Sequence, residues 1–303
     1  MLRLAAVAAA VLCLGAAPAD RILDDVRVLS ADDMQGREIG SPGSAKARAY
    51  LLQRFNEIGL KPVGATFEQP FAGVIRGQPR DGVNLVGRIE GRSPSGPILL
   101  VSAHYDHLGV QNGEVFNGAD DNASGVAAVL AIAEAFREDP PRHTVIIALW
   151  DGEEGGLAGS RAFVKAYPAR VARTALIMNL DMVGRGDKDE LYVAGASHYP
   201  FLKPRLEALA TRARVKLKLG HDGPPWTGHE DWTHQSDHAA FHAAKVPFAY
   251  FGVEDHPDYH KPTDHFEKIP AAFYRRSVAT LVEAARMFDR ELGAIAKESG
   301  RSF

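Results

Sequence analysis

The hydrophobic positions of the chain fall into short apolar runs that alternate with segments of helical spacing. Wholly apolar runs are typical of strands that are covered on both faces of a sheet, because such strands expose no polar side. Strands are predicted at Phe67–Gly77, Val83–Glu90, Pro97–Val101, Thr144–Trp150, Ala175–Leu180, Glu190–Val193 and Pro247–Phe251. Several of these runs are followed at once by acids or histidines.

Between the strands, apolar residues recur every three or four positions, which is the spacing of an amphipathic helix. Helices are predicted at Asp20–Leu29, Ser44–Ile58, Ala123–Phe136, Leu157–Tyr167, Phe201–Ala213, Ser236–Ala244 and Ala271–Leu292. Because strands and helices alternate, we expect a three-layer α/β/α fold, with a mixed, mostly parallel sheet flanked by helices. Gly220–Gln235 is a long loop, and long loops in compact domains tend to be functional.

Two adjacent glutamates, Glu153 and Glu154, follow the apolar run that ends at Trp150, after a turn of two residues. An isolated pair of this kind is usually two solvated acids on a loop. Here the pair is expected at the carboxyl edge of an α/β sheet, where ligands bind. Two carboxylates side by side are unfavourable there unless positive charge lies beside them, and metal ions would supply it.

Acids and histidines follow the other central strands as well. His104 and Asp106 come after Pro97–Val101 and point to the same side of an extended chain, so one can bind a metal while the other supports it. The remaining candidates are Asp120 and Asp121 at a helix start, Asp181 after Ala175–Leu180, and Asp255, His256, Asp258 and His260 after Pro247–Phe251. Carboxylate and imidazole ligands without sulfur suit a hydrolytic zinc site with one or two metals.

Five motifs occur in an order and at separations that resemble the family of co-catalytic dinuclear-zinc exopeptidases. They are His-x-Asp at 104–106, Asp-Asn-Ala-Ser-Gly at 121–125, Glu-Glu-Gly at 153–155, Asn-Leu-Asp at 179–181 and a late histidine at 260. This family includes secreted bacterial aminopeptidases, glutamate carboxypeptidase, glutaminyl cyclases and the inactive transferrin receptor ectodomain. The similarity runs from about Leu23 to the final predicted helix.

Carried over onto the matching positions, the resemblance implies two zinc ions per chain. His104 and Asp181 would bind one ion, and Glu154 and His260 would bind the other. Asp121 would bridge both ions.

Asp120 is the alternative bridge between the two ions. Asp121 is preferred because the bridging acid of the family directly precedes the residue that opens the x-Ala-Ser-Gly motif or its equivalent. In family members the peptide bond after the bridging acid is cis, so the resemblance also implies a cis bond between Asp121 and Asn122.

The resemblance assigns roles in catalysis to three further side chains. Glu153, which is next to a ligand but is not one, would take a proton from a metal-bound water and give it to the leaving amine. Asp106 would fix and polarise the ring of His104. Tyr259, directly before His260, would donate a hydrogen bond to the tetrahedral oxyanion.

Other conspicuous side chains are expected to have no part in the chemistry. Surface or helix positions are expected for His107, His143, His198 and His242, whereas loop positions that could line a substrate pocket are expected for His221, Trp226, His229, Trp232 and His234. Ser236, Asp237 and His238 are expected to be structural support, because three adjacent residues cannot adopt the geometry of a Ser/His/Asp triad. No Gly-x-Ser-x-Gly motif occurs in the chain.

The N-terminus is predicted to be a secretory signal peptide, residues 1–19, which precedes one catalytic domain, residues 20–303. A short charged start is followed by the apolar run Leu4–Ala17, and Ala17-Pro18-Ala19 fits the Ala-x-Ala cleavage pattern. The run is too short to span a membrane. We therefore expect export to the periplasm or the extracellular space.

Cysteine content and charge exclude several classes of function. Cys13 is the only cysteine and lies in the predicted signal peptide, so the mature chain has no thiol for catalysis or zinc binding. With 38 acids against 35 bases, the net charge of −3 provides no basic footprint for nucleic acid. We expect a peptide substrate, no nucleic-acid partner and a monomer.

Three classes of function fit these features. A metallo-aminopeptidase is favoured, since the length leaves no room for the extra domains of the carboxypeptidase branch, although carboxypeptidase or dipeptidase activity stays open. A glutaminyl cyclase-like acyltransferase with one zinc is the main alternative. A non-catalytic binding protein is disfavoured, because the ligands and Glu153 are all present.

Overall fold

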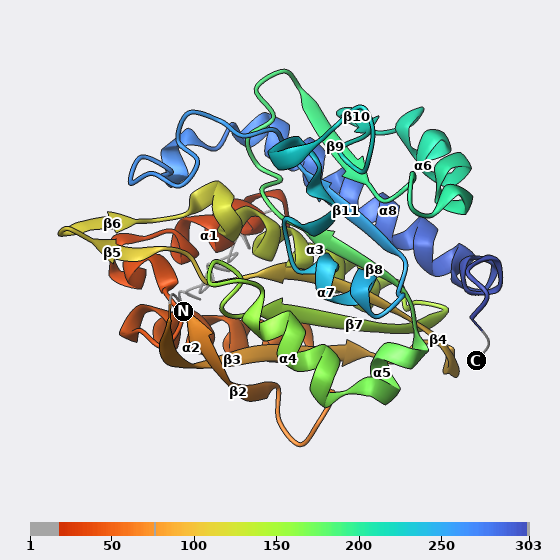
Figure 1. Cartoon of the computed structure of the whole chain (residues 1–303), viewed down its shortest axis with the longest axis horizontal. Helices are drawn as coiled ribbons and strands as arrows, with labels where there is room; N and C mark the ends of the chain where they lie inside the picture. Colours follow the sequence, from red (N-terminus) through yellow and green to blue (C-terminus); the bar gives the residue numbers. More distant parts are fainter. Residues whose placement is uncertain (1–17, 76, 302–303) are drawn as a thin grey trace, which may run out of the picture.

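A mixed β-sheet runs through the middle of the molecule, and helices cover both of its faces (Figure 1). The computed structural model describes residues 18–75 and 77–301. Within them the sheet has the strand order β1-β3-β7-β4-β8-β11-β9-β10, and β2 pairs with β3. Its strands are β1 (Lys61–Pro62), β2 (Glu68–Ile75), β3 (Gln78–Ile89), β4 (Ser93–His104), β7 (His143–Trp150), β8 (Thr174–Leu180), β9 (Glu190–Ala194), β10 (Lys216–Leu219) and β11 (Phe248–Gly252). A separate hairpin consists of β5 (Gly109–Gln111) and β6 (Glu114–Phe116).

The centre of the sheet is parallel. Strands β7, β4, β8 and β11 run in the same direction, whereas β3 and β9 flank them in the antiparallel sense. The predicted fold class, a mixed sheet with a parallel core flanked by helices, is confirmed. Because parallel strands end at the same edge, the segments that follow β4, β7, β8 and β11 emerge next to one another.

The apolar runs of the sequence form strands that are buried on both faces. In β4, Leu99 and Val101 pack into one hydrophobic cluster, while Ile98 and Leu100 pack into a second cluster on the opposite face. Successive side chains of a strand point to opposite faces, so an unbroken apolar run supplies both clusters at once.

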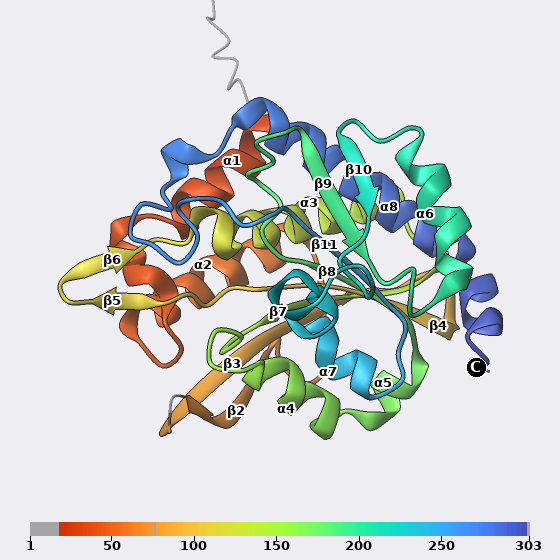
Figure 2. The same cartoon turned by 45° about the horizontal axis from the view of Figure 1, so that its top comes forward.

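The helices form the two outer layers (Figure 2). One face of the sheet is covered by α1 (Pro18–Leu29), α2 (Pro42–Ile58), α3 (Gly125–Glu138), α6 (Lys203–Ala210) and α8 (Ala271–Glu298). The other face is covered by α4 (Ala158–Ala166), α5 (Pro168–Arg173) and α7 (His238–Ala243). Helix α2 ends where Gly59 adopts a left-handed conformation, with φ of 77°, as expected for a glycine after a helix.

Several short elements were not predicted from the sequence, among them strand β1. Strand β10 alternates Lys and Leu and extends the sheet by pairing with β9, while Leu217 is buried. The hairpin β5–β6 and helix α5 were not predicted either. Short elements of this kind carry too few residues for a periodic pattern to emerge.

The predicted signal peptide, residues 1–19, lies outside the described residues except for its last two, which begin α1. Among the helices that the structure describes, none has the length and apolar character needed to cross a bilayer.

Candidate metal centre and active site

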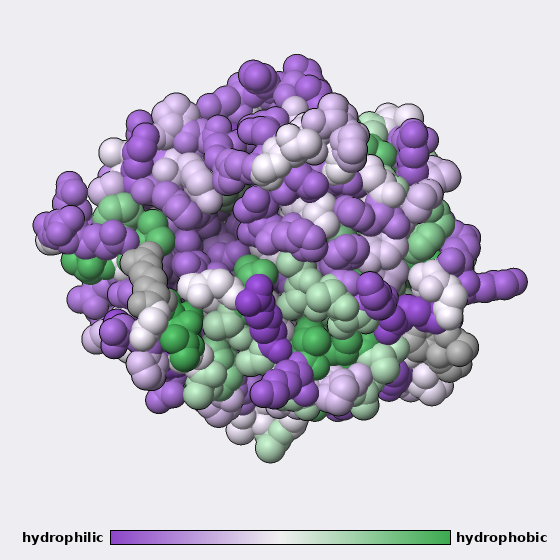
Figure 3. Space-filling view, viewed as in Figure 1, coloured by the Kyte–Doolittle hydropathy of each residue, from purple (hydrophilic) through white to green (hydrophobic). Residues whose placement is uncertain are grey.

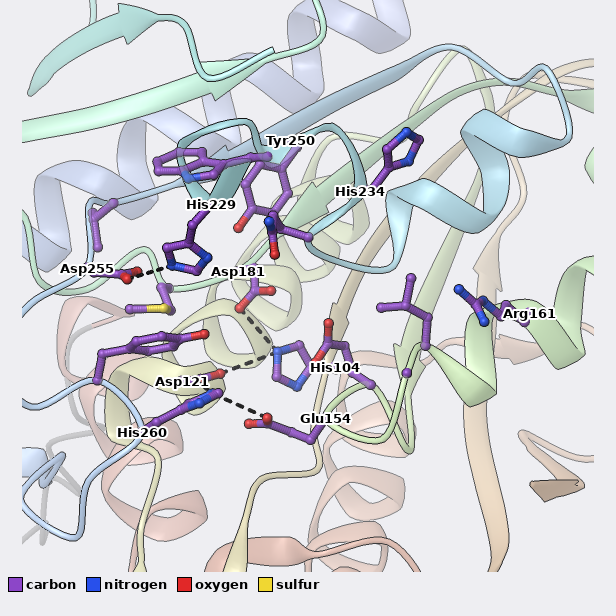
Figure 4. Close-up of a pocket in the computed structure, with 18 residues that line it drawn as sticks. His104, Asp121, Glu154, Arg161, Asp181, His229, His234, Tyr250, Asp255 and His260 are labelled. Atoms are coloured by element: carbon purple, nitrogen blue, oxygen red, sulfur yellow. Dashed lines mark hydrogen bonds and ion pairs between the residues drawn. The ribbon is translucent and has the colours of Figure 1, made fainter. Parts of the chain in front are cut away.

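A polar cavity lies at the carboxyl edge of the central strands. It has a volume of about 360 Å³ and is lined by side chains that follow β4, β7, β8 and β11 (Figure 4). The space-filling view shows a hollow with hydrophilic walls on this face of the molecule (Figure 3). The sheet edge therefore gathers the acids and histidines that the sequence pattern places there.

The first group of possible metal ligands consists of His104, Asp121 and Asp181. His104 Nε2 lies 3.1 Å from Asp181 Oδ1 and 3.4 Å from Asp121 Oδ1. All three residues are buried, and their ligand atoms lie within 4.8 Å of one another. This is the arrangement expected for the first predicted zinc site.

A second group lies on the other side of Asp121. His260 Nε2 is 3.1 Å from Asp121 Oδ2 and 3.3 Å from Glu154 Oε2. Asp121 thus presents one carboxylate oxygen to each group, as a bridging ligand would. All five predicted ligands converge on one cavity.

The prediction that His107 occupies a surface or helix position is wrong. Its side chain is fully buried, and its Nδ1 atom lies 2.7 Å from Glu154 Oε1 and 3.7 Å from Asp121 Oδ2. Strand β4 ends at His104, so the alternation of side chains along a strand gives no guide to the residues beyond it. Proximity to His104 in the sequence was the only available signal.

Asp120, the alternative bridge, is engaged elsewhere. Its Oδ2 atom lies 3.1 Å from His256 Nε2, and its Oδ1 atom accepts hydrogen bonds from Ser124 Oγ and the Gly184 N–H group. Its carboxylate therefore faces away from the cavity, and Asp121 is the acid that faces it.

The peptide bond between Asp121 and Asn122 is cis, as the family resemblance implied. Asn122 is fully buried, donates a hydrogen bond from Nδ2 to the carbonyl of Leu180, and accepts one from the N–H group of Gly125. A Cβ atom on Gly125 would lie 2.7 Å from that same carbonyl oxygen. The glycine therefore allows α3 to begin in close contact with the end of β8.

Asp106 supports the turn that carries the two glutamates. Its Oδ1 atom accepts a hydrogen bond of 3.0 Å from the N–H group of Glu153, and its Oδ2 atom one of 3.4 Å from that of Glu154. The predicted contact with His104 is longer, since Asp106 Oδ1 lies 3.7 Å from Nδ1 of that ring. The carboxylate of Asp106 therefore joins the end of β4 to the segment after β7.

The two glutamates experience opposite electrostatic environments. Burial raises the pKa of Glu153 well above its ordinary value, and the carboxylates of Asp181, Asp237 and Glu154 add to this effect against the attraction of His104. The pKa of Glu154 is lowered: burial opposes its charge, but its ion pairs with His107 and His260 outweigh burial. Contrasting environments of this kind are typical of neighbouring carboxylates with different roles.

Two tyrosines line the cavity. Tyr259 stacks on the ring of His260, with ring centroids 3.9 Å apart, and burial followed by the nearby carboxylates raises its pKa. Tyr250, on β11, was not singled out from the sequence; its phenol points into the cavity (Figure 4). Within the described residues, neither hydroxyl has a hydrogen-bond partner in the protein, and both side chains line the cavity.

Two buried groups beneath the site were missed by the sequence pattern. Arg37 donates hydrogen bonds to the carbonyls of Tyr105, Asn117 and Gly118, and burial lowers its pKa to about 10 even though nearby carboxylates oppose this shift. The carboxylate of Asp264 accepts hydrogen bonds from the N–H groups of Asp120 and Asp121.

Both groups fix backbone rather than line the cavity. Such contacts leave no periodic signal, because they depend on where distant loops meet.

The donor set fits a zinc centre. Imidazole nitrogens and carboxylate oxygens, with no sulfur, are ligands that zinc accepts, and Asp121 belongs to both groups of possible ligands. Burial and the nearby charge of Glu154 raise the pKa of Asp121, and a divalent cation beside this carboxylate would oppose both effects.

This combination of fold and site places the chain in the class of zinc exopeptidase folds. The solved structure of BSAP, a zinc aminopeptidase from Bacillus subtilis, superposes with a TM-score of 0.72 at 17% identity, covering 88% of this chain and 95% of that one. The glutaminyl cyclase of Fimbriiglobus ruber superposes with a TM-score of 0.69 at 23% identity, covering 94% and 99%. At these identities the likeness concerns the fold.

The family follows from the sequence. Residues 84–285 match the profile of Peptidase family M28, and the chain belongs to this family. The chain is 31% identical over 199 residues to Aminopeptidase YwaD of Bacillus subtilis (strain 168). The aligned segment covers 61% of this chain and 40% of that protein. The chain spans between 11% and 48% of the length of the first curated relatives that it matches. The predicted family resemblance is confirmed.

Proposed function

We propose that this protein is a zinc-dependent aminopeptidase that removes N-terminal residues from peptides. The observation that supports it best is the pair of ligand groups that share Asp121 in a cavity next to Glu153. Membership of family M28 and the likeness to zinc aminopeptidases support the same activity.

Two zinc ions would be held at this site. His104, Asp181 and Asp121 would hold one ion, and Glu154, His260 and Asp121 the other. When bound, the ions would polarise the scissile carbonyl group and acidify the attacking water.

We further propose that His107 belongs to the second zinc site. Among the described histidines, His107 brings a ring nitrogen, Nδ1, closest to the Glu154 carboxylate. The same nitrogen lies within 4.8 Å of the possible ligand atoms of Asp121 and Glu154. His107 would therefore either complete the coordination of this ion or orient the Glu154 carboxylate towards it.

Glu153 is proposed as the group that moves the proton. Its carboxylate would accept a proton from the attacking water and pass it to the leaving nitrogen as the peptide bond breaks. Asp106 would act as a positioning residue, because it holds the N–H groups of Glu153 and Glu154. The hydroxyl of Tyr259 would donate a hydrogen bond to the developing oxyanion, and Tyr250 is a second candidate donor.

A panel of aminoacyl chromogenic amides tests the activity. We expect hydrolysis of substrates with a free α-amine, no hydrolysis of their N-acetylated counterparts, loss of turnover with a chelator, and recovery on addition of zinc. Hydrolysis that survives complete removal of metal would contradict the proposal.

A glutaminyl cyclase-like activity is the second candidate. It is supported by the Fimbriiglobus ruber structure, which covers nearly the whole of both chains. Formation of pyroglutamate from peptides with N-terminal glutamine, together with one zinc ion per chain, would favour this alternative over an aminopeptidase. Release of free amino acid with two ions per chain would exclude it.

We also propose that residues 1–19 direct export. The charged start, apolar run and Ala-x-Ala pattern of the sequence support this proposal. Expression of the full chain in a bacterium, followed by fractionation and N-terminal sequencing, tests it. We expect mature protein outside the cytoplasm that begins at Asp20, and intact cytoplasmic protein would contradict it.

A further inference from the structure

A second cavity continues from the metal centre along the protein surface. It has a volume of about 460 Å³ and lies between α4 and α7. Leu157, Arg161 and His234 line both cavities, so the two are continuous. We call this second cavity the α4–α7 groove.

The groove is lined by positively charged side chains, and none of its described lining residues is acidic. Arg161 and Lys165 lie one helical turn apart on α4, and both are exposed. In the part of the chain that the structure describes, neither makes an ion pair or a side-chain hydrogen bond. Like charges four residues apart weaken a helix unless an anion lies near them. The pair is therefore suited to an anionic ligand.

The floor of the groove is apolar. It is lined by Val164 from α4 and by Ala239 and Ala240 from α7, beside the positively charged side chains of Arg161 and Lys165. The space-filling view shows hydrophobic side chains over α4 and α7 with strongly hydrophilic ones beside them (Figure 3). An apolar floor with cations at its side fits a peptide better than an inorganic anion, because a peptide offers carbon surface as well as charge.

The two connected cavities differ in the charged side chains that line them. The metal cavity contains the carboxylates of Asp181, Glu153 and Asp255, whereas Arg161 projects towards it from α4 (Figure 4). A peptide that lies across both cavities would therefore place its α-ammonium group near the acids and an anionic group near Arg161.

We propose that the α4–α7 groove binds the leaving part of the substrate and recognises a carboxylate there through Arg161 and Lys165. This inference rests on the proposed aminopeptidase activity and adds its substrate class: peptides with a negative charge downstream of the cleaved bond. The carboxylate is supplied either by the C-terminus of a short peptide or by an acidic side chain.

Two pairs of substrates distinguish these sources. Leucyl-glycyl-glycine and its C-terminal amide differ only in the terminal carboxylate. Leucyl-glycyl-glutamate amide and its glutamine counterpart differ only in the side-chain carboxylate. For at least one pair, we expect the wild-type KM for the anionic member to be roughly 3- to 10-fold lower, with similar kcat. The pair that shows the difference identifies the source.

Variants locate the effect. Arg161→Ala is expected to bring the ratio of the two KM values close to one, while Arg161→Lys retains part of the preference because it retains the charge. Arg290→Ala is the matched control, since it removes an exposed arginine of α8, on the opposite layer. Two results would overturn the inference. One is a ratio of KM values in Arg161→Ala equal to that of the wild type, and the other is a wild type that prefers the anionic member of neither pair.

Failure of the proposed activity is recognised separately. If the zinc-loaded wild type hydrolyses none of the four peptides, calorimetric binding of the same peptides still tests the groove. Tighter binding of the anionic member by the same factor, lost in Arg161→Ala, would support the inference even then. Equal binding of both members would contradict it.

Discussion

At the scale of single residues, the candidate site depends on contrasts between neighbours. Glu153 and Glu154 are adjacent, yet one lies beside carboxylates and the other beside two histidines. Asp120 and Asp121 are adjacent, yet one pairs with His256 and the other faces the cavity. Substitutions of one member of each pair are therefore informative.

Glu153→Gln is expected to leave metal binding intact and to lower kcat by at least 100-fold, because the amide cannot accept the proton of the attacking water. Metal content by atomic emission and turnover of an aminoacyl amide measure the two effects. Near-normal turnover in this variant would remove Glu153 from the mechanism.

His107→Ala is expected to lower the affinity of one of two zinc ions by about 10- to 100-fold, since it removes the closest partner of Glu154. Stepwise removal of zinc by a chelator measures the affinity, and the absorption spectrum of the cobalt-substituted protein reports on coordination. His143→Ala, at the opposite end of β7, is the control. Two equally tight ions in both variants would show that His107 has no role in metal binding.

The hydrophobic pattern placed the residues that follow a strand directly, and the family resemblance placed Asp121 and His260, which lie away from strand ends. His104 and Asp181 could be placed because the ends of buried strands are visible in the hydrophobic pattern. His107, Arg37 and Asp264 could not, because their contacts are made between loops that are far apart along the chain. The roles of the site residues stay predictions, and the variants above test those of Glu153 and His107.

At the scale of elements, the strands and helices with a clear apolar pattern were predictable, including the short β9, β11 and α7, whereas short elements without such a pattern were not. Strand β7 begins one residue before its predicted start, at His143, whereas β10 was not predicted. Helix α7 is short but carries a fully buried histidine, His238, whose Nε2–H group donates to the carbonyl of Trp232.

Burial lowers the pKa of His238 to about 3, from an ordinary value of 6.5. The folded protein therefore keeps this ring neutral, while the unfolded chain takes up a proton once the pH falls below about 6.5. The contribution of His238 to the free energy of unfolding is therefore complete above about pH 6.5 and is lost progressively as the pH falls towards 3.

His238→Gln keeps a donor for Trp232 and removes the titration. Relative to this variant, the wild type is expected to lose about 2 kcal/mol of unfolding free energy between pH 7 and pH 5. Urea unfolding with a chelator present, so that metal release does not contribute, measures the difference. Parallel pH profiles of the two proteins would contradict this expectation.

At the scale of the whole molecule, the candidate metal centre joins several distant segments. Its candidate ligands come from the ends of β4 and β8, the segments after β7 and β11, and the turn before α3. A cation bound there would hold both the central strands and the segment that leads into α8.

Zinc is therefore expected to stabilise the fold. At a free concentration 100 times its Kd, one bound ion adds about 2.7 kcal/mol, which corresponds to a rise of several degrees in Tm. Thermal unfolding with zinc and with a chelator measures the shift. Asp121→Asn is expected to lose most of it, and a shift of equal size in that variant would show that zinc binds elsewhere.

The spread of the ligands along the chain has a consequence for biosynthesis. Because His260 is the last of them, a nascent polypeptide cannot assemble the complete centre until the ribosome has made nearly all of it. If the proposed ligands are correct, a product that ends before residue 260 would lack one of them, and we expect it to bind the second ion poorly and to be inactive.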